Sequence, residues 1–433
     1  MSDTADLATG FAEAMAALCG VQIPAKLAIA VSGGGDSLAL LYLVAHWARP
    51  RAVTLSVVTI DHQLRPESGA EAALVKQVAA GLSLAHTTLL WDGWDGQGNL
   101  SDAAREARLA LIDHWRGDIR HVLMAHTQDD QAETFLMRLR RGSGVDGLSG
   151  MAADHLIEHR TRASLNQRLV EPKSWHVLRP LLGVSRASLR TYLTQIGAQW
   201  VEDPSNSDLR YERVRMRQLT PTLNAVGLHQ KGLAQTTKRL RRARTALIRR
   251  AQDVAQKIAQ QQDGDVVFDL AGLRQVEEET QLRLLAAALC WVSSNLYRPR
   301  LSGLESCLQA ALSGTNGVLH GGLIRVGGTN LTVTREYQMV RDVRQIAGQD
   351  SLWDGRWKIS GSAIEGADIR ALGSEGVRQI GSGWKNRPNH AIILSKPGIF
   401  RGKQLFSCQA AGFGPAYKQE IFPLSFTSLL IEH

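Results

Sequence analysis

The first third of the chain alternates apolar, β-rich runs with helical stretches, and this alternation constrains the fold more than any other feature. The four apolar runs cover residues 27–32, 53–61, 84–91 and 121–126, and each is followed by a stretch with helical character. Strands that alternate with helices are typical of βαβ units and a parallel sheet. Near-continuous apolar strands indicate that both faces of the sheet are covered. We therefore predict an α/β domain whose ligands bind beyond the carboxyl ends of its strands.

The length of 433 residues predicts two or three domains, at about 100–200 residues for each domain. We place the boundaries near residues 217 and 340, where the composition shifts. This division gives an N-terminal parallel-sheet domain (residues 1–217), a mainly helical domain (218–340) and a small β-containing C-terminal domain (341–433).

Several later segments have a clear local pattern. Residues 281–296 and 301–314 predict two helices, and residues 322–337 predict a β-hairpin around a Gly-Gly pair. The short runs at residues 356–360 and 391–395 are β-like and predict strands.

The chain is basic, with 50 Lys and Arg against 41 Asp and Glu, a net charge of +9 and a pI of about 9.6. Such an excess favours a polyanionic partner, nucleic acid first, over a protein that is basic without a partner. The basic residues concentrate at 210–257, where Glu212 and Asp253 are the acids. We expect this stretch to contact a phosphate backbone. The alternative is a solvated charged helix, which usually interleaves both signs of charge.

The cysteines and the N-terminus indicate an intracellular protein. The four cysteines form no CxxC and have no zinc-type spacing, so neither a disulfide scaffold nor an iron–sulfur site is expected. Acids come early in the N-terminal segment, which does not resemble a secretory signal. No apolar run approaches the ~20 residues that cross a bilayer. We expect a cytoplasmic protein with no membrane partner, and a homodimer is left open.

A glycine-rich turn follows the first predicted strand. Glycines let the backbone approach an anion closely, and the following helix start offers free N–H groups and a positive dipole. The turn lacks the lysine of a GxxxxGK[ST] loop. A carboxylate beside phosphates repels them unless Mg²⁺ lies between, so Asp36 is the predicted metal ligand. The alternative is a plain turn with a helix cap. The predicted nucleotide-binding residues of the turn are Ser32, Gly33, Gly34, Gly35, Asp36 and Ser37.

The SGGGDS sequence of this turn resembles the signature of the PP-loop ATP pyrophosphatase superfamily. Further blocks follow in order, and together they resemble the bacterial tRNA(Ile)-lysidine synthases over about residues 27–217. The resemblance implies an adenine nucleotide alpha hydrolase-like fold for the N-terminal domain. The blocks are DHQLR at 61–65 with Glu67 and Ser68, the N…AR..R pattern at 99–108, AHTQDDQAET at 125–134, RGSG at 141–144 with the GL and GM pairs up to 151, RPLL at 179–182, EDPSN at 202–206, and Tyr211 with Arg213 and Arg215.

The resemblance implies a reaction in two steps. ATP adenylates the C2 oxygen of the wobble cytidine of an isoleucine tRNA with a CAU anticodon, and pyrophosphate leaves. The ε-amino group of free L-lysine then attacks C2 and displaces AMP. ATP and Mg²⁺ are the implied cofactors, and this tRNA and lysine are the implied partners.

The acidic block after the fourth strand is the predicted lysine site. Lysine arrives as an ammonium with a pKa of about 10.4, and an acidic pocket can hold it and accept its proton. Asp129, Asp130 and Glu133 are the predicted lysine-binding residues, and the last two are one helical turn apart on one face. The alternative is a helix capping box. The predicted catalytic residues are Asp36, His126, Asp130 and Glu133, with His126 as a base or an orienting group.

Other predictions follow from the motif context. Asp61 and His62 come after a strand end, and we expect them on the ATP side of the site or beside the target base; ordinary loop polarity is the alternative. Single arginines are more often surface ion pairs. The predicted tRNA-binding residues are Arg105, Arg141, Arg239, Arg241, Arg242 and Arg244.

Two other functions compete with this interpretation. A PP-loop tRNA thiolase needs cysteine chemistry, yet Cys19, Cys290, Cys307 and Cys408 lie away from the predicted strand ends. A tRNA-binding module with an inactive nucleotide site does not need the intact SGGGDS and HTQDDQAET blocks. Both alternatives are therefore weaker than the synthase interpretation.

Overall fold

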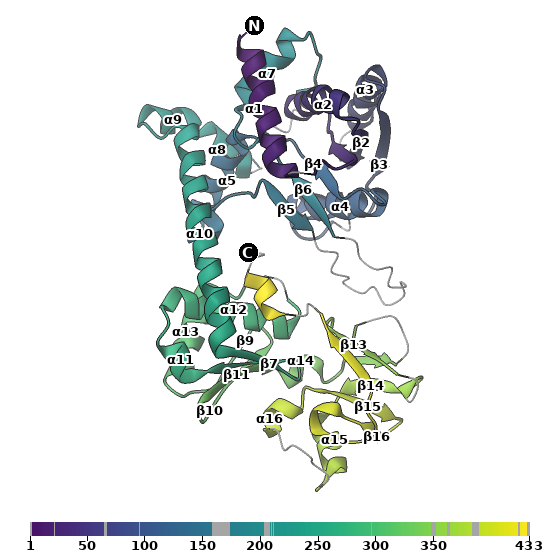
Figure 1. The fold of residues 1–433 in the computed structure, drawn as a ribbon, viewed down its shortest axis with the longest axis vertical. Coiled ribbons are helices and arrows are strands. Elements are labelled where there is room, and N and C mark those ends of the chain that lie inside the picture. The colour runs from purple at the N-terminus through teal and green to yellow at the C-terminus, as the bar shows by residue number, and fades with distance from the viewer. Residues whose placement is uncertain are drawn as a thin grey trace. The chain divides into compact units, whose positions relative to one another are not determined.

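The computed structural model shows two compact units, Met1–His159 with Pro172–Arg244, and a second that contains Thr245–His433 (Figure 1). The division falls inside the long helix α10 (Gln230–Ile258). The predicted functional boundaries near 217 and 340 stay predictions. The residues that the structure describes are 2–20, 22–64, 67–94, 96–157, 174–202, 208, 210, 212–295, 297–347, 352–361, 364–382, 389–422 and 425–430.

The first unit is built on a six-stranded sheet with the order β3-β2-β1-β4-β6-β5. Neighbouring strands are parallel except β5 and β6, which pair in antiparallel fashion. The four predicted strands are confirmed as β1 to β4, and the sequence did not predict β5 and β6. The strands are β1 (Lys26–Ala30), β2 (Thr54–Asp61), β3 (Ala85–Leu90), β4 (His121–Leu123), β5 (Asp154–Ile157) and β6 (Trp175–Leu178).

Both faces of this sheet are buried, as the apolar strands predicted. In the central strand β1, Leu27 and Ile29 belong to one apolar cluster and Ala28 belongs to another. The predicted helices after each strand are confirmed as α2 to α5. The helices of the unit before α10 are α1 (Ser2–Cys19), α2 (Gly35–Ala48), α3 (Ser68–Gly81), α4 (Leu100–Trp115), α5 (Gln128–Arg140), α6 (Val145–Leu148), α7 (Arg186–Gln195), α8 (Glu212–Gln218) and α9 (Thr220–Ala225), with a 3₁₀ turn at Arg49–Arg51.

The first part of the second unit combines helices with a five-stranded antiparallel sheet of order β7-β8-β11-β10-β9. The two predicted helices and the predicted hairpin, β10 with β11, are confirmed. Gly328 has a φ of +60° in the hairpin turn, a conformation that favours glycine. The elements are β7 (Ala259–Gln262), β8 (Asp265–Asp269), α11 (Leu270–Arg274), α12 (Glu278–Ser293), α13 (Leu301–Leu312), β9 (Gly317–Leu319), β10 (Gly322–Gly327), β11 (Asn330–Arg335) and α14 (Tyr337–Val340).

The C-terminal part contains a four-stranded antiparallel sheet, β12-β14-β15-β16, and the pair β13–β17. The strand predicted at 356–360 is confirmed as β13, but the strand predicted at 391–395 is wrong. That segment starts in the helical turn α16, because the side chain of Asn389 accepts a hydrogen bond from Ala391 N–H and caps it. The elements are β12 (Arg344–Ile346), β13 (Trp357–Ser360), β14 (Asp368–Ala371), α15 (Gly373–Ile380), α16 (His390–Ile393), β15 (Pro397–Arg401), β16 (Gln404–Ser407) and β17 (Lys418–Ile421), with 3₁₀ turns at Gln409–Ala411 and Phe426–Leu430.

Buried polar contacts join the two parts of the second unit. Lys396 Nζ donates to Asp265, and both side chains are almost fully buried. Arg335 holds Asp354 with two hydrogen bonds of 2.9 Å each. Such pairs are costly to break because one charge is then left buried alone. Across the described residues, no helix has the length and apolar character needed to span a membrane.

Candidate active site

The turn after β1 offers unpaired backbone N–H groups at a helix start. Gly34 is the N-cap of α2, and no acceptor among the described residues contacts the N–H groups of Gly33 or Gly34. Gly33 has a φ of +91°, which a residue with a side chain rarely adopts. The N–H groups and the helix dipole together form a cradle for phosphate.

Two serines and a neighbouring segment hold this turn in shape. The Ser37 hydroxyl donates to Gly34 O over 2.8 Å and accepts from Ser32 N–H over 3.2 Å. Val201 N–H donates to Gly33 O over 3.1 Å. A Cβ atom on Gly35 would lie 3.3 Å from the Trp200 ring, so the indole closes one side of the turn. Ser37 therefore fixes the loop, and the backbone supplies the free donors.

Asp130 has a different task at each oxygen. Its Oδ2 accepts hydrogen bonds of 2.8 Å from both the N–H and the hydroxyl of Thr127, which completes a capping box at the start of α5. Its Oδ1 faces Arg186 Nη2 over 3.2 Å. Burial raises the pKa of Asp130, but Arg186, Arg213 and the Thr127 N–H outweigh it and hold the pKa below its usual value. The carboxylate is therefore charged at neutral pH.

Three arginines surround Glu133, whose side chain is 2% exposed. Arg217 Nε lies 2.9 Å from Glu133 Oε1, Arg186 Nη1 lies 3.3 Å from the same oxygen, and Arg213 Nε lies 3.5 Å from Oε2. Asp129 is close by, because its Oδ2 accepts from the main-chain N–H of Arg186 over 2.7 Å. The predicted carboxylates of α5 are thus brought together, but as partners of arginines.

Asp36 belongs to the same cluster. Its Oδ2 accepts from Arg186 Nε over 2.9 Å, and its side chain is 23% exposed. Burial raises the pKa of Asp36, and Arg186 acts in the opposite direction. Arg186 consequently links the phosphate loop of α2 to the carboxylates of α5.

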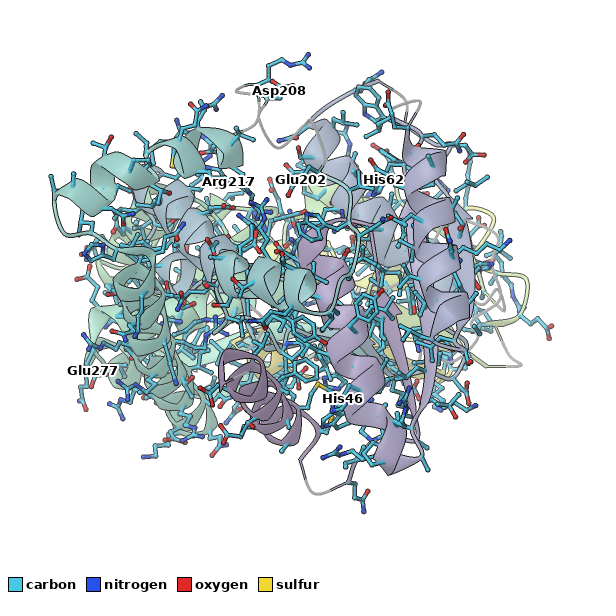
Figure 2. All side chains as sticks on the ribbon, turned by 90° about the horizontal axis from the view of Figure 1, so that it is seen from above. His46, His62, Glu202, Asp208, Arg217 and Glu277 are labelled. Atoms are coloured by element: carbon cyan, nitrogen blue, oxygen red, sulfur yellow. The ribbon has the colours of Figure 1, made fainter. Side chains whose placement is uncertain are left out.

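The sequence missed these arginines as site residues. Arg213 and Arg217 are four residues apart on α8, a spacing that puts both on one helix face, and this signal was available. Arg186 directly follows the helix cap Ser185, and no local pattern marks it. Figure 2 shows the side chains of the structure, with labels on Arg217 and, separately, on Glu202 and His62.

His126 is a neutral group in this structure. Its Nδ1 accepts from Arg179 Nε over 3.3 Å. Burial, together with the charge of Arg179, lowers the pKa of His126 to about 3. A neutral imidazole whose Nδ1 accepts carries its proton on Nε2.

Asp61 and His62 lie at the carboxyl end of β2. Asp61 Oδ1 accepts from Gln63 N–H over 2.8 Å, which shapes the loop after the strand. The His62 ring stands edge-on to the Trp91 ring with centroids 5.3 Å apart, and its buried Nδ1 has no partner among the described residues. Burial, with the charge of Arg108 second, lowers the pKa of His62 to about 4. Trp91 and His62 therefore present an aromatic ring and a neutral imidazole at this edge of the sheet.

The predicted tRNA-binding arginines differ in their surroundings. Arg105, Arg239 and Arg242 are exposed. Arg141 lies beside Glu212, which also contacts Arg140 over 2.6 Å. Arg241 and Arg244 are half-buried and contact other residues of the first unit. Arg241 donates to the carbonyl groups of Ser149 and Met151, and Arg244 Nε lies 3.3 Å from Asp146 Oδ1.

Known proteins that resemble this chain point to one family. A family model of the PP-loop domain matches residues 7–223. The tRNA(Ile)-lysidine synthase of Ruegeria pomeroyi is 38% identical over 404 residues, which cover 92% of each chain. The chain belongs to the tRNA(Ile)-lysidine synthase family. The synthase of Wolbachia pipientis wMel is 33% identical over 79% of each chain, and that of Rhodopseudomonas palustris is 41% identical over 57% of this chain and 68% of its own.

One solved structure is a U34-tRNA thiolase, NcsA, from Methanococcus maripaludis. It aligns with a TM-score of 0.43 and 14% identity over 54% of this chain and 78% of its own. Membership of the tRNA(Ile)-lysidine synthase family confirms the prediction of an ATP-using PP-loop enzyme.

Parts of the family motifs lie outside the described residues, namely Arg65, residues 203–206 and Tyr211. Within the described residues, no group of three or more His, Cys, Asp or Glu side chains is arranged to hold a metal ion. The cysteines take no part in the site. Cys290 and Cys408 are buried, and burial raises the pKa of Cys19 and Cys307 as well as that of Cys408.

Proposed function

We propose that this chain joins free L-lysine to C2 of the wobble cytidine of an isoleucine tRNA with a CAU anticodon, at the expense of ATP. The observation that carries the proposal is that the phosphate cradle of α2 and the carboxylates of α5 meet at one sheet edge, through Arg186, in a member of this family. The products are lysidine in the tRNA, AMP and pyrophosphate.

The first half-reaction needs a place for triphosphate. The amide groups of Gly33 and Gly34 supply hydrogen-bond donors at the positive end of α2. The C2 oxygen of cytidine then attacks the α-phosphorus, and pyrophosphate departs. This converts a poor leaving group into AMP.

A single carboxylate with ATP phosphates is a usual environment for Mg²⁺, which keeps several waters and takes one or two protein carboxylates. Asp36 fits this role because it follows the amide cradle directly and its side chain is partly exposed. Bound there, Mg²⁺ would neutralise charge on the phosphates.

The second half-reaction needs a lysine amine. Asp130 and Glu133 present carboxylate oxygens on one face of α5, and they are our choice for the substrate ammonium. The amine attacks C2 only after it loses a proton, and a charged carboxylate such as Asp130 can accept that proton. His126 is neutral, and we assign it the orientation of neighbouring groups rather than the proton transfer.

The tRNA needs a larger surface than this pocket. The exposed arginines Arg239 and Arg242 of α10, with Arg105 of α4, are our choice for contacts to its phosphates. A cytoplasmic location and a homodimer stay predictions.

The test is incubation with ATP, Mg²⁺, labelled lysine and an isoleucine tRNA transcript that carries the CAU anticodon. We expect label in the tRNA, one AMP for each lysine, and a lysidine nucleoside after digestion. A matched transcript with uridine at the wobble position should stay unlabelled. AMP release that is independent of lysine, with no label in the RNA, would contradict the proposed function.

A further inference from the structure

Arg186 is the cation at the centre of the site, and its guanidinium contacts three carboxylates that come from two helices. Nε lies 2.9 Å from Asp36, Nη2 lies 3.2 Å from Asp130 and Nη1 lies 3.3 Å from Glu133. The side chain is 18% exposed, so these contacts are shielded from solvent. The planar guanidinium of an arginine holds several N–H donors in fixed directions, so it suits such a set of carboxylates better than the ammonium of a lysine does.

The backbone fixes where this guanidinium lies. Arg186 is the first residue of α7, whose N-cap Ser185 accepts from Ser188 N–H over 3.1 Å. The main-chain N–H of Arg186 also donates to Asp129 over 2.7 Å. The start of α7 is therefore tied to the start of α5, and the arginine is not a mobile surface side chain.

The three carboxylates depend on Arg186 to different degrees. Glu133 also contacts Arg217 and Arg213, and Asp130 lies 4.0 Å from Arg213 and keeps its two bonds to Thr127. Asp36 has no cationic partner other than Arg186 among the described residues. Asp36 is consequently the carboxylate whose charge is left unbalanced when the guanidinium moves.

We propose that Arg186 is a positioning residue that acts as a resident counter-cation: it holds Asp36 beside Asp130 and Glu133 in the ligand-free protein, and it gives up Asp36 to the magnesium ion that accompanies ATP. The proposal rests on the proposed function, because it takes Asp36 as the magnesium ligand. Two cations compete for one carboxylate, so a protein without the arginine binds the metal more readily. The guanidinium stays beside the α5 carboxylates Asp130 and Glu133.

The test is the binding of a non-hydrolysable ATP analogue, titrated with Mg²⁺ and followed by calorimetry and by Tm. Arg186→Gln should lower Tm in EDTA and lower the Mg²⁺ concentration at half-saturation by about tenfold, the size of one charged hydrogen bond. Arg186→Lys keeps the charge but lacks the planar set of N–H donors, and we expect it to lower the Mg²⁺ concentration at half-saturation by about threefold. Arg190→Gln is the matched control, because Arg190 lies one turn later on α7 and pairs at the surface with Glu202. It should behave as wild type.

Asp36→Asn separates the failure of this inference from that of the proposed metal ligand. Loss of Mg²⁺-dependent analogue binding in Asp36→Asn, with a lowered midpoint in the Arg186 variants, supports the inference. Unchanged Mg²⁺ dependence in Asp36→Asn would show that Asp36 is not the metal ligand. Loss of that dependence, with an unchanged or higher midpoint in both Arg186 variants, overturns the role of Arg186 alone. If Arg186→Gln does not fold, the lysine variant decides the question by the direction of its shift.

Discussion

Thr127 and Asp130 are joined by reciprocal hydrogen bonds at the start of α5. The N–H and the hydroxyl of Thr127 each donate to Asp130 Oδ2 over 2.8 Å, and Asp130 N–H donates to Thr127 Oγ over 3.3 Å. Asp130 Oδ1 points instead to the arginine cluster. The capping alternative and the site prediction are therefore compatible, because one carboxylate caps the helix with one oxygen and faces the site with the other.

The two tasks of Asp130 are separable by mutation. Asp130→Asn keeps the shape but removes the charge, so we expect lysine KM to rise about 10- to 100-fold, as for a lost hydrogen bond to a charged group. The affinity for an ATP analogue should stay close to that of wild type. Steady-state kinetics with varied lysine and calorimetry with the analogue measure the two quantities.

Thr127→Ala is the control for the helix cap. It removes the hydroxyl but keeps the N–H and the carboxylate, so it should cost about 1 kcal/mol of stability, seen as a lower Tm, with little change in lysine KM. If Asp130→Asn weakens binding of the ATP analogue and leaves lysine KM unchanged, the carboxylate of Asp130 contributes to nucleotide binding rather than to lysine binding.

The phosphate loop gives a second matched pair. Gly33 has a φ of +91° and a Cβ there would lie 3.4 Å from Glu71 O, so Gly33→Ala should cost about 1–2 kcal/mol and lower Tm. Gly34 has a φ of −72°, and the nearest atom to its Cβ would be Ser32 Oγ at 3.8 Å. Gly34→Ala should therefore keep Tm. Equal Tm values for the two variants would show that the loop relaxes freely. The affinity of Gly34→Ala for the ATP analogue then shows whether an added methyl group at this position blocks the approach of phosphate to the backbone N–H groups.

The sequence predicted the elements whose signal is local. The runs that became β1 to β4 are mainly apolar, and the helix starts at Gly35 and Gln128 follow the ends of β1 and β4 after short loops. Because parallel neighbours such as β1 and β4 end at the same edge, Asp36 and Asp130 were predictable members of one site. By contrast, the pairing of β6 (Trp175–Leu178) with β4 is a tertiary contact with no local pattern.

The rest of the site depends on contacts that the sequence pattern does not contain. Arg186 lies 150 positions from Asp36 along the chain, and only the packing of α7 against the α2 region brings them together. For the basic stretch at 210–257, the sequence shows the charge but does not show which arginines face solvent. The helix periodicity turns Arg241 and Arg244 inward and leaves Arg239 and Arg242 exposed.

His126 predicts an acid sensitivity of the fold. Its pKa is lowered to about 3, from an ordinary value of about 6.5 in the unfolded chain. Between pH ~6.5 and pH ~3, the unfolded chain therefore binds a proton at His126 that the folded chain does not bind. This contribution to the free energy of unfolding is present above pH ~6.5 and is lost as pH falls toward 3. The loss reaches about 1.4 kcal/mol per pH unit.

His126→Gln removes this titration and keeps an acceptor for Arg179. We expect the Tm of wild type to fall more steeply than that of the variant between pH 7 and pH 4.5, so that the two curves converge toward acid pH. Parallel Tm curves would show that His126 titrates alike in both states. His62→Gln should flatten the curve in the same way between pH ~6.5 and pH ~4, because the pKa of His62 is lowered from about 6.5 to about 4.

The exposed arginines of α10 predict a salt-dependent grip on tRNA. Arg239 and Arg242 are exposed, and each phosphate that they neutralise releases counterions. Arg239→Ala with Arg242→Ala should weaken tRNA binding and reduce the slope of log affinity against log salt by about 1.5. Tm should be unchanged, because neither side chain has an ion pair or hydrogen bond among the described residues. The measurement is tRNA affinity at several salt concentrations, with adenylation at saturating tRNA as a check on the active site.

Arg241→Ala with Arg244→Ala is the matched control on the same helix, with the same loss of charge. These side chains contact the carbonyl groups of Ser149 and Met151 and the carboxylate of Asp146. Their removal breaks the hydrogen bonds to these carbonyl groups and the contact with Asp146, and a hydrogen bond from a charged group contributes about 1.5–3 kcal/mol, so this pair should lower Tm. If the control reduces the salt slope as much as the exposed pair does, the change reflects net charge alone. If neither pair changes the slope, the phosphates are bound by another surface, and the basic face of α10 is only solvated.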